Sequence, residues 1–162
     1  MCQALDLQHK KGPAMQLRRH SHEIPRGCKR YYKFCFVRNP FDRMVSVYFR
    51  GKKRGRVPSW FSFLDFCHQI DTPKYYHPWM CDPQVRWTEN TNLEFIGRFE
   101  NLEKDFQRVV KAIDFEPCEL PWENAEKHGP YRDYYCDEST EMIGCLFKED
   151  FETFGYTTKL RG

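Results

Sequence analysis

The sequence has no long hydrophobic run: no apolar stretch approaches the roughly 18 residues that a membrane-spanning helix needs. Its N-terminal segment, MCQALDLQHKKGPAMQLRRH, also lacks the apolar centre of a secretory signal peptide. These two absences predict a chain that is soluble as written, with no membrane segment of its own.

The cysteines form no metal-binding pattern. None of the eight stands in a C-x-x-C pair, which excludes the spacing of a zinc ribbon. His77 and Cys81 are four residues apart, but Pro78 disfavours the helix that would direct both side chains to one metal ion. We therefore predict no metal site. The even number of cysteines permits disulfides in a lumenal or secreted protein and buried thiols in a cytosolic one, and both alternatives stay open.

A large excess of charge is absent as well, because the formal net charge of +3 is far below that of a histone-like polycation. The positive charge is local instead: RGKKRGR at residues 50–56 carries five basic residues in seven. Such a run suits a polyanionic partner, and it is equally well explained as the solvated end of a helix and the loop after it.

No repeat, low-complexity segment or linker divides the 162 residues, and 40% of them are hydrophobic. We therefore predict a single globular domain over residues 1–162. YYKFCFV at 31–37 is rich in aromatic and β-forming residues and predicts a buried strand, and LEFIGR at 93–98 predicts a second, short one. Because strand patterns alternate with helix patterns, the predicted fold class is α/β with a parallel sheet.

Apolar residues at helical spacing predict four main helices, in addition to a short one over 13–22. The first has Asn39 as its N-cap and Pro40 directly after it, continues to about Arg50, and ends at Gly51 and Gly55. The other three are predicted to begin at Ser59, Asn101 and Glu138, and the last of them to end near Gly155.

Arg38 stands where the first predicted strand meets the first predicted helix, a place where backbone N–H groups at a helix start commonly hold a phosphate. The guanidinium group can grip such an anion through two hydrogen bonds. Arg43, Ser46 and Arg50 follow at spacings of three and four, so they share one stripe of the helix and extend the predicted site. The alternative is that Arg38 pairs with Asp42 and Ser46 is a small surface residue.

Three segments of the chain carry a family resemblance. KFCFVRNPFDRMVSVYFR resembles the strand–turn–helix of sulfotransferases that use 3′-phosphoadenosine 5′-phosphosulfate (PAPS), closest to the carbohydrate sulfotransferase branch. LEFIGRFENLEKDFQRVV and HGPYRDYYCDESTEMIGCLFKEDFETFGY are similar to later blocks of the same family, in the same order. The resemblance extends from about residue 29 to residue 156. It implies a three-layer parallel sheet of the P-loop nucleotide-binding type.

The resemblance also implies an activity, the transfer of a sulfuryl group from PAPS to a hydroxyl or amine, with a carbohydrate as the expected acceptor. Arg38 and Ser46 match the family's arginine and serine that bind the 3′-phosphate of PAPS. Arg43 is a weaker candidate for the same phosphate. Arg132 is expected to close over the nucleotide, with a surface ion pair to Asp133 or Glu138 as the alternative. No metal is implied.

Two histidines are candidates for the general base that deprotonates the acceptor, because an imidazole titrates near neutral pH. His9 and His77 lie near positions where relatives carry a histidine, and each is equally explained as an ordinary surface or hydrogen-bonded histidine. Glu100 matches an acidic position of the family, for which bracing the next helix is the simpler explanation.

The lysine-bearing loop with which the family grips the 5′-phosphosulfate has no counterpart. HKKGPAMQ, the nearest segment, has no strand pattern before it and no run of small residues to cradle a phosphate. We therefore expect the chain to begin downstream of the first strand, that loop and much of the first helix, which puts catalysis by this chain alone in doubt. The same expectation leaves the compartment open between a cytoplasmic prokaryotic enzyme and a Golgi enzyme with an upstream membrane anchor.

Two rival functions follow from these features. The first is an inactive relative that binds nucleotide or glycan without turnover. The second is a nucleic-acid-binding module built on residues 50–56 and Trp60, whose affinity would fall steeply with salt. The oligomeric state is not indicated by the sequence.

Overall fold

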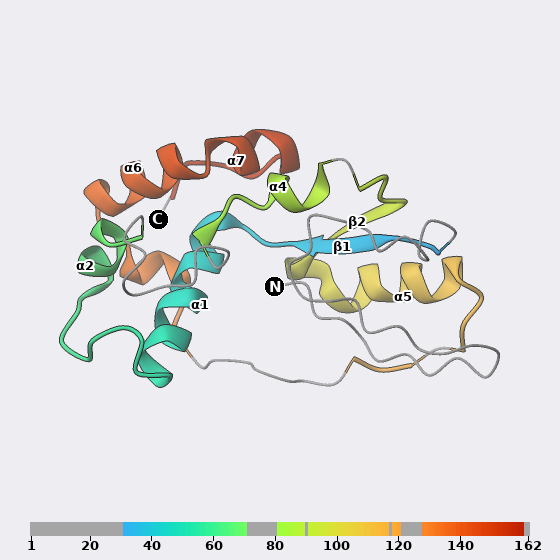
Figure 1. Ribbon diagram of the computed structural model, residues 1–162, viewed down its shortest axis with the longest axis horizontal. Coiled ribbons are helices and arrows are strands. Elements are labelled where there is room, and N and C mark those ends of the chain that lie inside the picture. Colours follow the sequence, from blue (N-terminus) through green and yellow to red (C-terminus); the bar gives the residue numbers. More distant parts are fainter. Residues whose placement is uncertain (1–30, 71–80, 90, 117, 121–127, 161–162) are drawn as a thin grey trace. The chain divides into compact units, whose positions relative to one another are not determined.

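The computed structural model describes residues 31–70, 81–89, 91–116, 118–120 and 128–160, and its helices and strands are shown in Figure 1. Contacts divide the chain into two units, each described separately. One comprises Met1–Arg38 with Arg86–Pro121, and the other comprises Asn39–Val85 with Trp122–Gly162. The short helix α4, Val85–Thr88, lies at the junction of the two in the sequence. The helix predicted over 13–22 falls outside the described residues.

The first unit contains two parallel strands, β1 (Phe34–Val37) and β2 (Phe95–Arg98). Phe34 pairs with Phe95 at one end and Val37 with Arg98 at the other, which confirms the predicted parallel pairing. Both strands are shorter than predicted. Lys33 explains this, because its backbone N–H donates to a Glu94 carboxylate oxygen (2.6 Å) and the side chains form an ion pair (Nζ–Oε1 2.7 Å). The Lys33 N–H thus bonds to a side chain instead of the neighbouring backbone, although the Lys33 carbonyl still accepts the Glu94 backbone N–H (2.9 Å).

The helix α5 (Leu102–Ala112) follows β2 after a 3₁₀ turn, η2 (Phe99–Asn101). Asn101 precedes the helix as predicted, but its side chain makes no capping hydrogen bond. Phe106 and Val110 pack with Phe36 of β1 into a small hydrophobic core. Gly97, opposite Phe36 in the register, has no room for a side chain, because a Cβ there would overlap the Phe36 ring.

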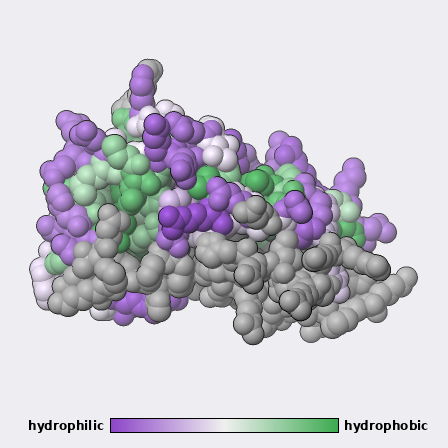
Figure 2. Space-filling model, turned by 45° about the horizontal axis from the view of Figure 1, so that its top comes forward, coloured by the Kyte–Doolittle hydropathy of each residue, from purple (hydrophilic) through white to green (hydrophobic). Residues whose placement is uncertain are grey.

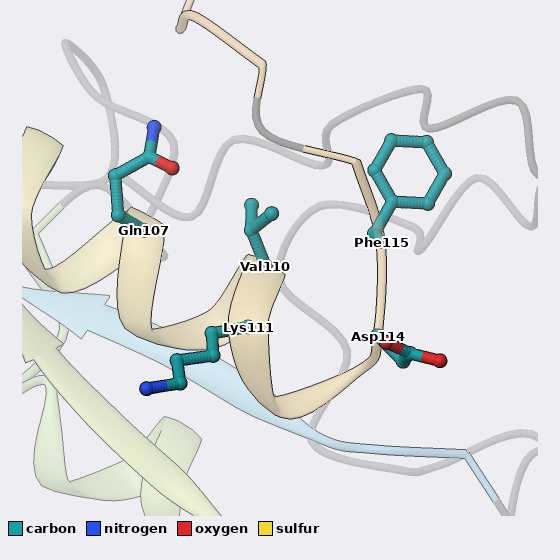
Figure 3. Close-up of a pocket in the computed structure, with 5 residues that line it drawn as sticks. All are labelled: Gln107, Val110, Lys111, Asp114 and Phe115. Atoms are coloured by element: carbon teal, nitrogen blue, oxygen red, sulfur yellow. The ribbon is translucent and has the colours of Figure 1, made fainter.

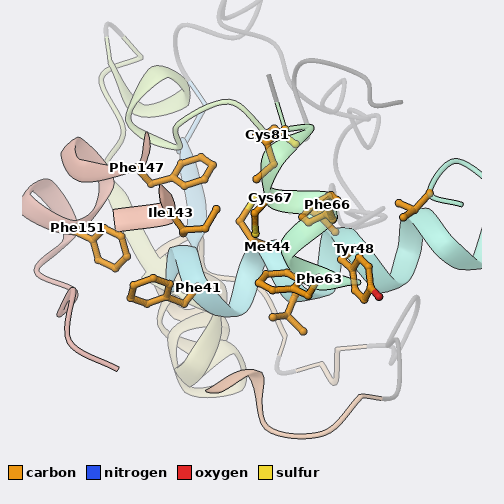
Figure 4. Close-up of a cluster of buried hydrophobic side chains, with 14 residues drawn as sticks. Phe41, Met44, Tyr48, Phe63, Phe66, Cys67, Cys81, Ile143, Phe147 and Phe151 are labelled. Carbon is orange, nitrogen blue, oxygen red and sulfur yellow. The ribbon is translucent and has the colours of Figure 1, made fainter. Parts of the chain in front are cut away.

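The second unit consists of helices around a larger hydrophobic core, shown in Figure 4. Its helices are α1 (Pro40–Lys53), α2 (Phe63–His68), α6 (Asp137–Leu146) and α7 (Lys148–Phe154), with a 3₁₀ turn η3 (Tyr131–Tyr134). The largest side chains that are fully buried in this core are those of Phe41, Met44, Phe66, Ile143, Phe147 and Phe151. Among the described residues of this unit, eight pairs of aromatic rings have centroids within 5.5 Å of each other, so aromatic contacts dominate its packing.

Helix α1 begins as predicted and ends later than predicted. The Asn39 side chain accepts a hydrogen bond from the Phe41 N–H (2.9 Å), and Pro40 occupies the first helical position. Gly51 does not stop the helix; it is buried inside the last turn. Gly55 does, with a φ of +64° that closes the turn after Lys53.

The other two predictions in this unit require correction. Helix α2 begins at Phe63, because Ser62 and Asp65 form a capping box (Asp65 N to Ser62 Oγ 3.1 Å, Ser62 N to Asp65 Oδ2 2.8 Å). The predicted start at Ser59 is wrong. The single helix predicted up to Gly155 is also wrong: the structure has two helices, α6 and α7, separated by the fully buried Phe147. Gly155 ends the second with a φ of +65°.

The remaining structural features concern the surface and the cysteines. Hydrophilic side chains cover much of the face shown in Figure 2, and hydrophobic ones gather in smaller areas between them. No helix in the described segments is long and apolar enough to cross a membrane. The six cysteines among the described residues are free thiols, and burial raises the pKa of Cys67 to about 12.

Two glycines provide a matched test of the core packing. Gly97→Ala should lower the free energy of unfolding by about 1–3 kcal/mol, because the added methyl group overlaps Phe36. Gly144→Ala should raise it by up to about 1 kcal/mol, since Gly144 lies inside α6 with open space around it. Urea denaturation followed by circular dichroism measures both. A Gly97→Ala protein as stable as the wild type would show that Phe36 does not pack on the glycine.

Candidate anion-binding residues

Arg38 lies over the ring of Phe99, a contact that the sequence analysis did not predict. Its guanidinium carbon lies 4.4 Å from the centroid of the Phe99 ring. The strand register explains this contact, because Val37 pairs with Arg98 and the next residue of each strand therefore lies alongside the other. Phe99 thus restricts where the half-buried Arg38 side chain can direct its N–H groups.

Asp105 in turn fixes the segment that carries Phe99. This carboxylate is 5% exposed and accepts the Arg98 N–H (Oδ2, 2.8 Å), while Arg108 Nη1 donates to its other oxygen (3.1 Å). The first turns of α5 therefore hold the end of β2, and through it Phe99, in one position. The sequence contained a signal for this, since Asp105 is an acidic residue in the first turn of the helix predicted after the second strand.

Ser46 is half-buried on α1, and its hydroxyl forms no hydrogen bond to another described residue. The two arginines predicted to share its stripe have a different environment: Arg43 is 4% exposed and Arg50 8%. The stripe is therefore not an open polar surface. Of the three residues, only Ser46 is partly exposed, and its hydroxyl is available to a ligand because no residue in the described part of the chain bonds to it.

Arg43 faces a buried carboxylate on α7. Its Nη1 lies 3.9 Å from Asp150 Oδ2, and its guanidinium carbon lies 5.6 Å from the centroid of the Phe147 ring. Asp150 is fully buried and accepts hydrogen bonds from the Gln84 and Val85 backbone N–H groups (2.9 Å each) and from the Gln84 amide (3.1 Å). Charge and hydrogen bonds satisfy this carboxylate in the interior, so Arg43 braces α1 against α7.

The segment that carries Arg132 packs against α1, the helix of Ser46. The Tyr135 hydroxyl donates to the Phe41 carbonyl (2.9 Å), and the ring of Phe49 stacks on His128 with centroids 5.5 Å apart. Arg132 itself is exposed on η3, with its guanidinium carbon 5.8 Å from the Tyr131 ring. The structure thus brings the predicted residues Ser46 and Arg132 onto neighbouring elements.

Neither predicted general base can be located, because His9 and His77 lie outside the described residues. The described histidines have other partners: His68 Nε2 lies 3.0 Å from a Glu138 oxygen, and the His128 ring is stacked on Phe49. No group of side chains with the geometry of a metal site occurs in the described part of the chain.

A hollow of about 340 Å³ lies at the C-terminal end of α5. Figure 3 shows the five residues that line it: Gln107, Val110, Lys111, Asp114 and Phe115. None of them is a predicted site residue. One of them, Gln107, donates through its amide to the Cys118 carbonyl (2.9 Å), so that side chain has a structural role at least.

Comparison with known proteins gives one family. The sequence pattern of the sulfotransferase family matches residues 4–157, which include Arg38, Ser46, Arg132 and both candidate bases. An uncharacterized protein of Archaeoglobus fulgidus is 33% identical over 89 residues, which cover 51% of this chain and 68% of that protein. No solved structure matches the chain at a significant level.

The buried carboxylate generates a stability prediction. Asp150→Ala should lower the free energy of unfolding by about 3–5 kcal/mol, because the buried Arg43 loses its opposite charge and the two backbone N–H groups lose their acceptor. Glu152→Ala on the same helix is the control. Its pair with Lys148 is exposed (3.8 Å), so the change should stay within about 0.5 kcal/mol. Equal effects of the two substitutions in thermal denaturation would contradict the role given to Asp150.

Proposed function

Because the chain belongs to the sulfotransferase family, we propose that it transfers a sulfuryl group from PAPS to a hydroxyl or amine, with a carbohydrate as acceptor. In this reaction the acceptor oxygen or nitrogen bonds to sulfur while the bond from sulfur to the 5′-phosphate oxygen breaks. The acceptor proton passes to a general base, and 3′-phosphoadenosine 5′-phosphate leaves. The family match over nearly the whole chain is the observation that carries this proposal.

Arg38 and Ser46 are proposed to bind the 3′-phosphate of the nucleotide. The resemblance of residues 33–50 to the family's strand–turn–helix supports this, and so does the local environment of each residue. Phe99 positions the Arg38 guanidinium, and the Ser46 hydroxyl has no other partner among the described residues. A guanidinium and a hydroxyl are suitable donors for a phosphate dianion.

We propose different roles for Arg43 and Arg132. The proximity of Arg43 to Asp150 makes it a residue that positions α1, the helix that carries Ser46. Arg132 is exposed on a turn packed against α1, so it is proposed to contact the nucleotide from outside.

His9 and His77 remain the proposed general bases, one of which would take the acceptor proton. The parallel pair β1 and β2 is proposed to belong to a three-layer sheet of the P-loop nucleotide-binding type. In such a sheet ligands bind beyond the carboxyl ends of the strands, which is where Arg38 stands in the sequence.

Calorimetry with 3′-phosphoadenosine 5′-phosphate tests the nucleotide site. Arg38→Ala should weaken binding about tenfold or more, because a charge-assisted, bidentate contact is lost. Ser46→Ala should weaken it by about tenfold, the effect of one hydrogen bond from a neutral donor to a charged acceptor. Lys104→Ala, an exposed residue of α5, is the control and should bind as the wild type does.

Two outcomes of that titration would contradict the proposal in different ways. No binding by the wild-type chain would remove the nucleotide from its function. Equal binding by the wild type and Arg38→Ala would remove Arg38 from the site. Binding that persists without sulfuryl transfer from labelled PAPS would identify the non-catalytic alternative.

The ring beneath Arg38 provides a separate prediction. Phe99→Leu keeps an apolar side chain but removes the π face, so nucleotide affinity should fall about twofold to fivefold through loss of the cation–π contact. Phe99→Tyr keeps the ring and should bind as the wild type does. If Leu and Tyr at this position are indistinguishable in the titration, Phe99 does not position Arg38.

A further inference from the structure

The loop that joins α1 to α2 combines exposed positive charge with an exposed aromatic ring. Lys53, Arg54 and Arg56 are exposed, and Trp60 follows with 80% of its surface accessible. Trp60 is the one large hydrophobic residue that is exposed among the described residues of the second unit. The indole thus offers a flat apolar face beside a cluster of positive charge, a combination suited to a ligand that carries both an apolar face and negative charges.

The loop is ordered by its own contacts, so the exposure of Trp60 does not result from a loose segment. The backbone N–H groups of Arg56 and Val57 both donate to the Gly51 carbonyl (2.9 and 3.2 Å), and Val57 is 2% exposed. At the other end the Tyr48 hydroxyl donates to the Phe61 carbonyl (2.9 Å). Trp60 is therefore presented to solvent from a fixed backbone.

The basic side chains determine which partner this ring suits. A pyranose ring offers a flat apolar face that packs on an indole, while carboxylate or sulfate groups on the same chain attract Lys and Arg. A membrane surface fits less well, since one exposed Trp supplies too little apolar area for insertion. Single-stranded nucleic acid stacks on a succession of aromatic rings, and this loop exposes one.

We propose that the loop 53–60 is an exosite that binds an acidic polysaccharide chain, so that the acceptor of the sulfuryl group is a polymer held at two places. This inference rests on the proposed function. Arg54 caps α1 eight residues after Ser46, which at a helical rise of 1.5 Å per residue is roughly 12 Å along the helix axis. A single sugar unit is too short to reach from the nucleotide site to the loop, whereas an extended chain of several units can contact both.

A binding titration with size-graded heparin oligosaccharides tests the exosite on the full chain. Affinity should rise with oligosaccharide length and fall with added salt. Trp60→Ala and Arg54→Glu should each weaken binding of the longest oligosaccharide about tenfold, and Trp60→Phe should retain most of it. Lys148→Glu is the charge-matched control, because it makes the same change of charge at an exposed residue of α7. It should leave the affinity unchanged.

Three results would contradict the exosite. Trp60→Ala could bind heparin as tightly as the wild type, or Lys148→Glu could lose as much heparin affinity as Arg54→Glu. The third is a wild-type affinity for neutral dextran equal to that for heparin. Tighter, loop-dependent binding of a single-stranded DNA oligonucleotide or of phosphatidylserine vesicles would replace the polysaccharide by another partner. The nucleotide titration separates this inference from the proposed function. Loop variants should bind 3′-phosphoadenosine 5′-phosphate normally, and Arg38→Ala should bind heparin normally.

Discussion

The parallel pairing of β1 with β2 is the constraint on which the environment of Arg38 depends. With Val37 opposite Arg98, the residues that follow are Arg38 and Phe99, and the guanidinium lies over the ring. Gly97 permits that register, because Phe36 occupies the space where its side chain would be. Asp105 then holds the end of β2 through the Arg98 N–H. A packing requirement in the core thus determines the orientation of a charged side chain at the strand end.

Helix α1 combines two kinds of polar residue that the sequence pattern could not separate. Arg43 and Ser46 are three residues apart on one stripe, yet Arg43 is buried beside Asp150 and Ser46 is partly exposed. The buried pair connects α1 with α7 and with the backbone at Gln84 and Val85. A helix held in this way presents its remaining polar side chains in fixed positions, which is what recognition of a phosphate requires.

The local parts of this architecture were predictable and the long-range parts were not. The Asn39 cap and the turn at Gly55 depend on residue types with strong local preferences, and the structure has both. The break at Phe147 has no glycine or proline to signal it, because burial of the ring decides it. The contacts of Arg43 with Asp150 and of Arg38 with Phe99 depend on tertiary packing and strand register, which periodicity does not specify. The roles of Arg38 and Ser46 toward a nucleotide stay predictions that rest on the family resemblance.

The central claim is that Arg38 and Ser46 recognise the 3′-phosphate of an adenosine nucleotide, and a crystal structure of the chain with 3′-phosphoadenosine 5′-phosphate tests it most directly. The account predicts that the 3′-phosphate lies within hydrogen-bonding distance, about 2.7–3.2 Å, of both the Arg38 guanidinium and the Ser46 hydroxyl. It also predicts that Arg38 remains over the Phe99 ring in the complex. A nucleotide bound elsewhere, or one whose 3′-phosphate contacts neither residue, would contradict the claim.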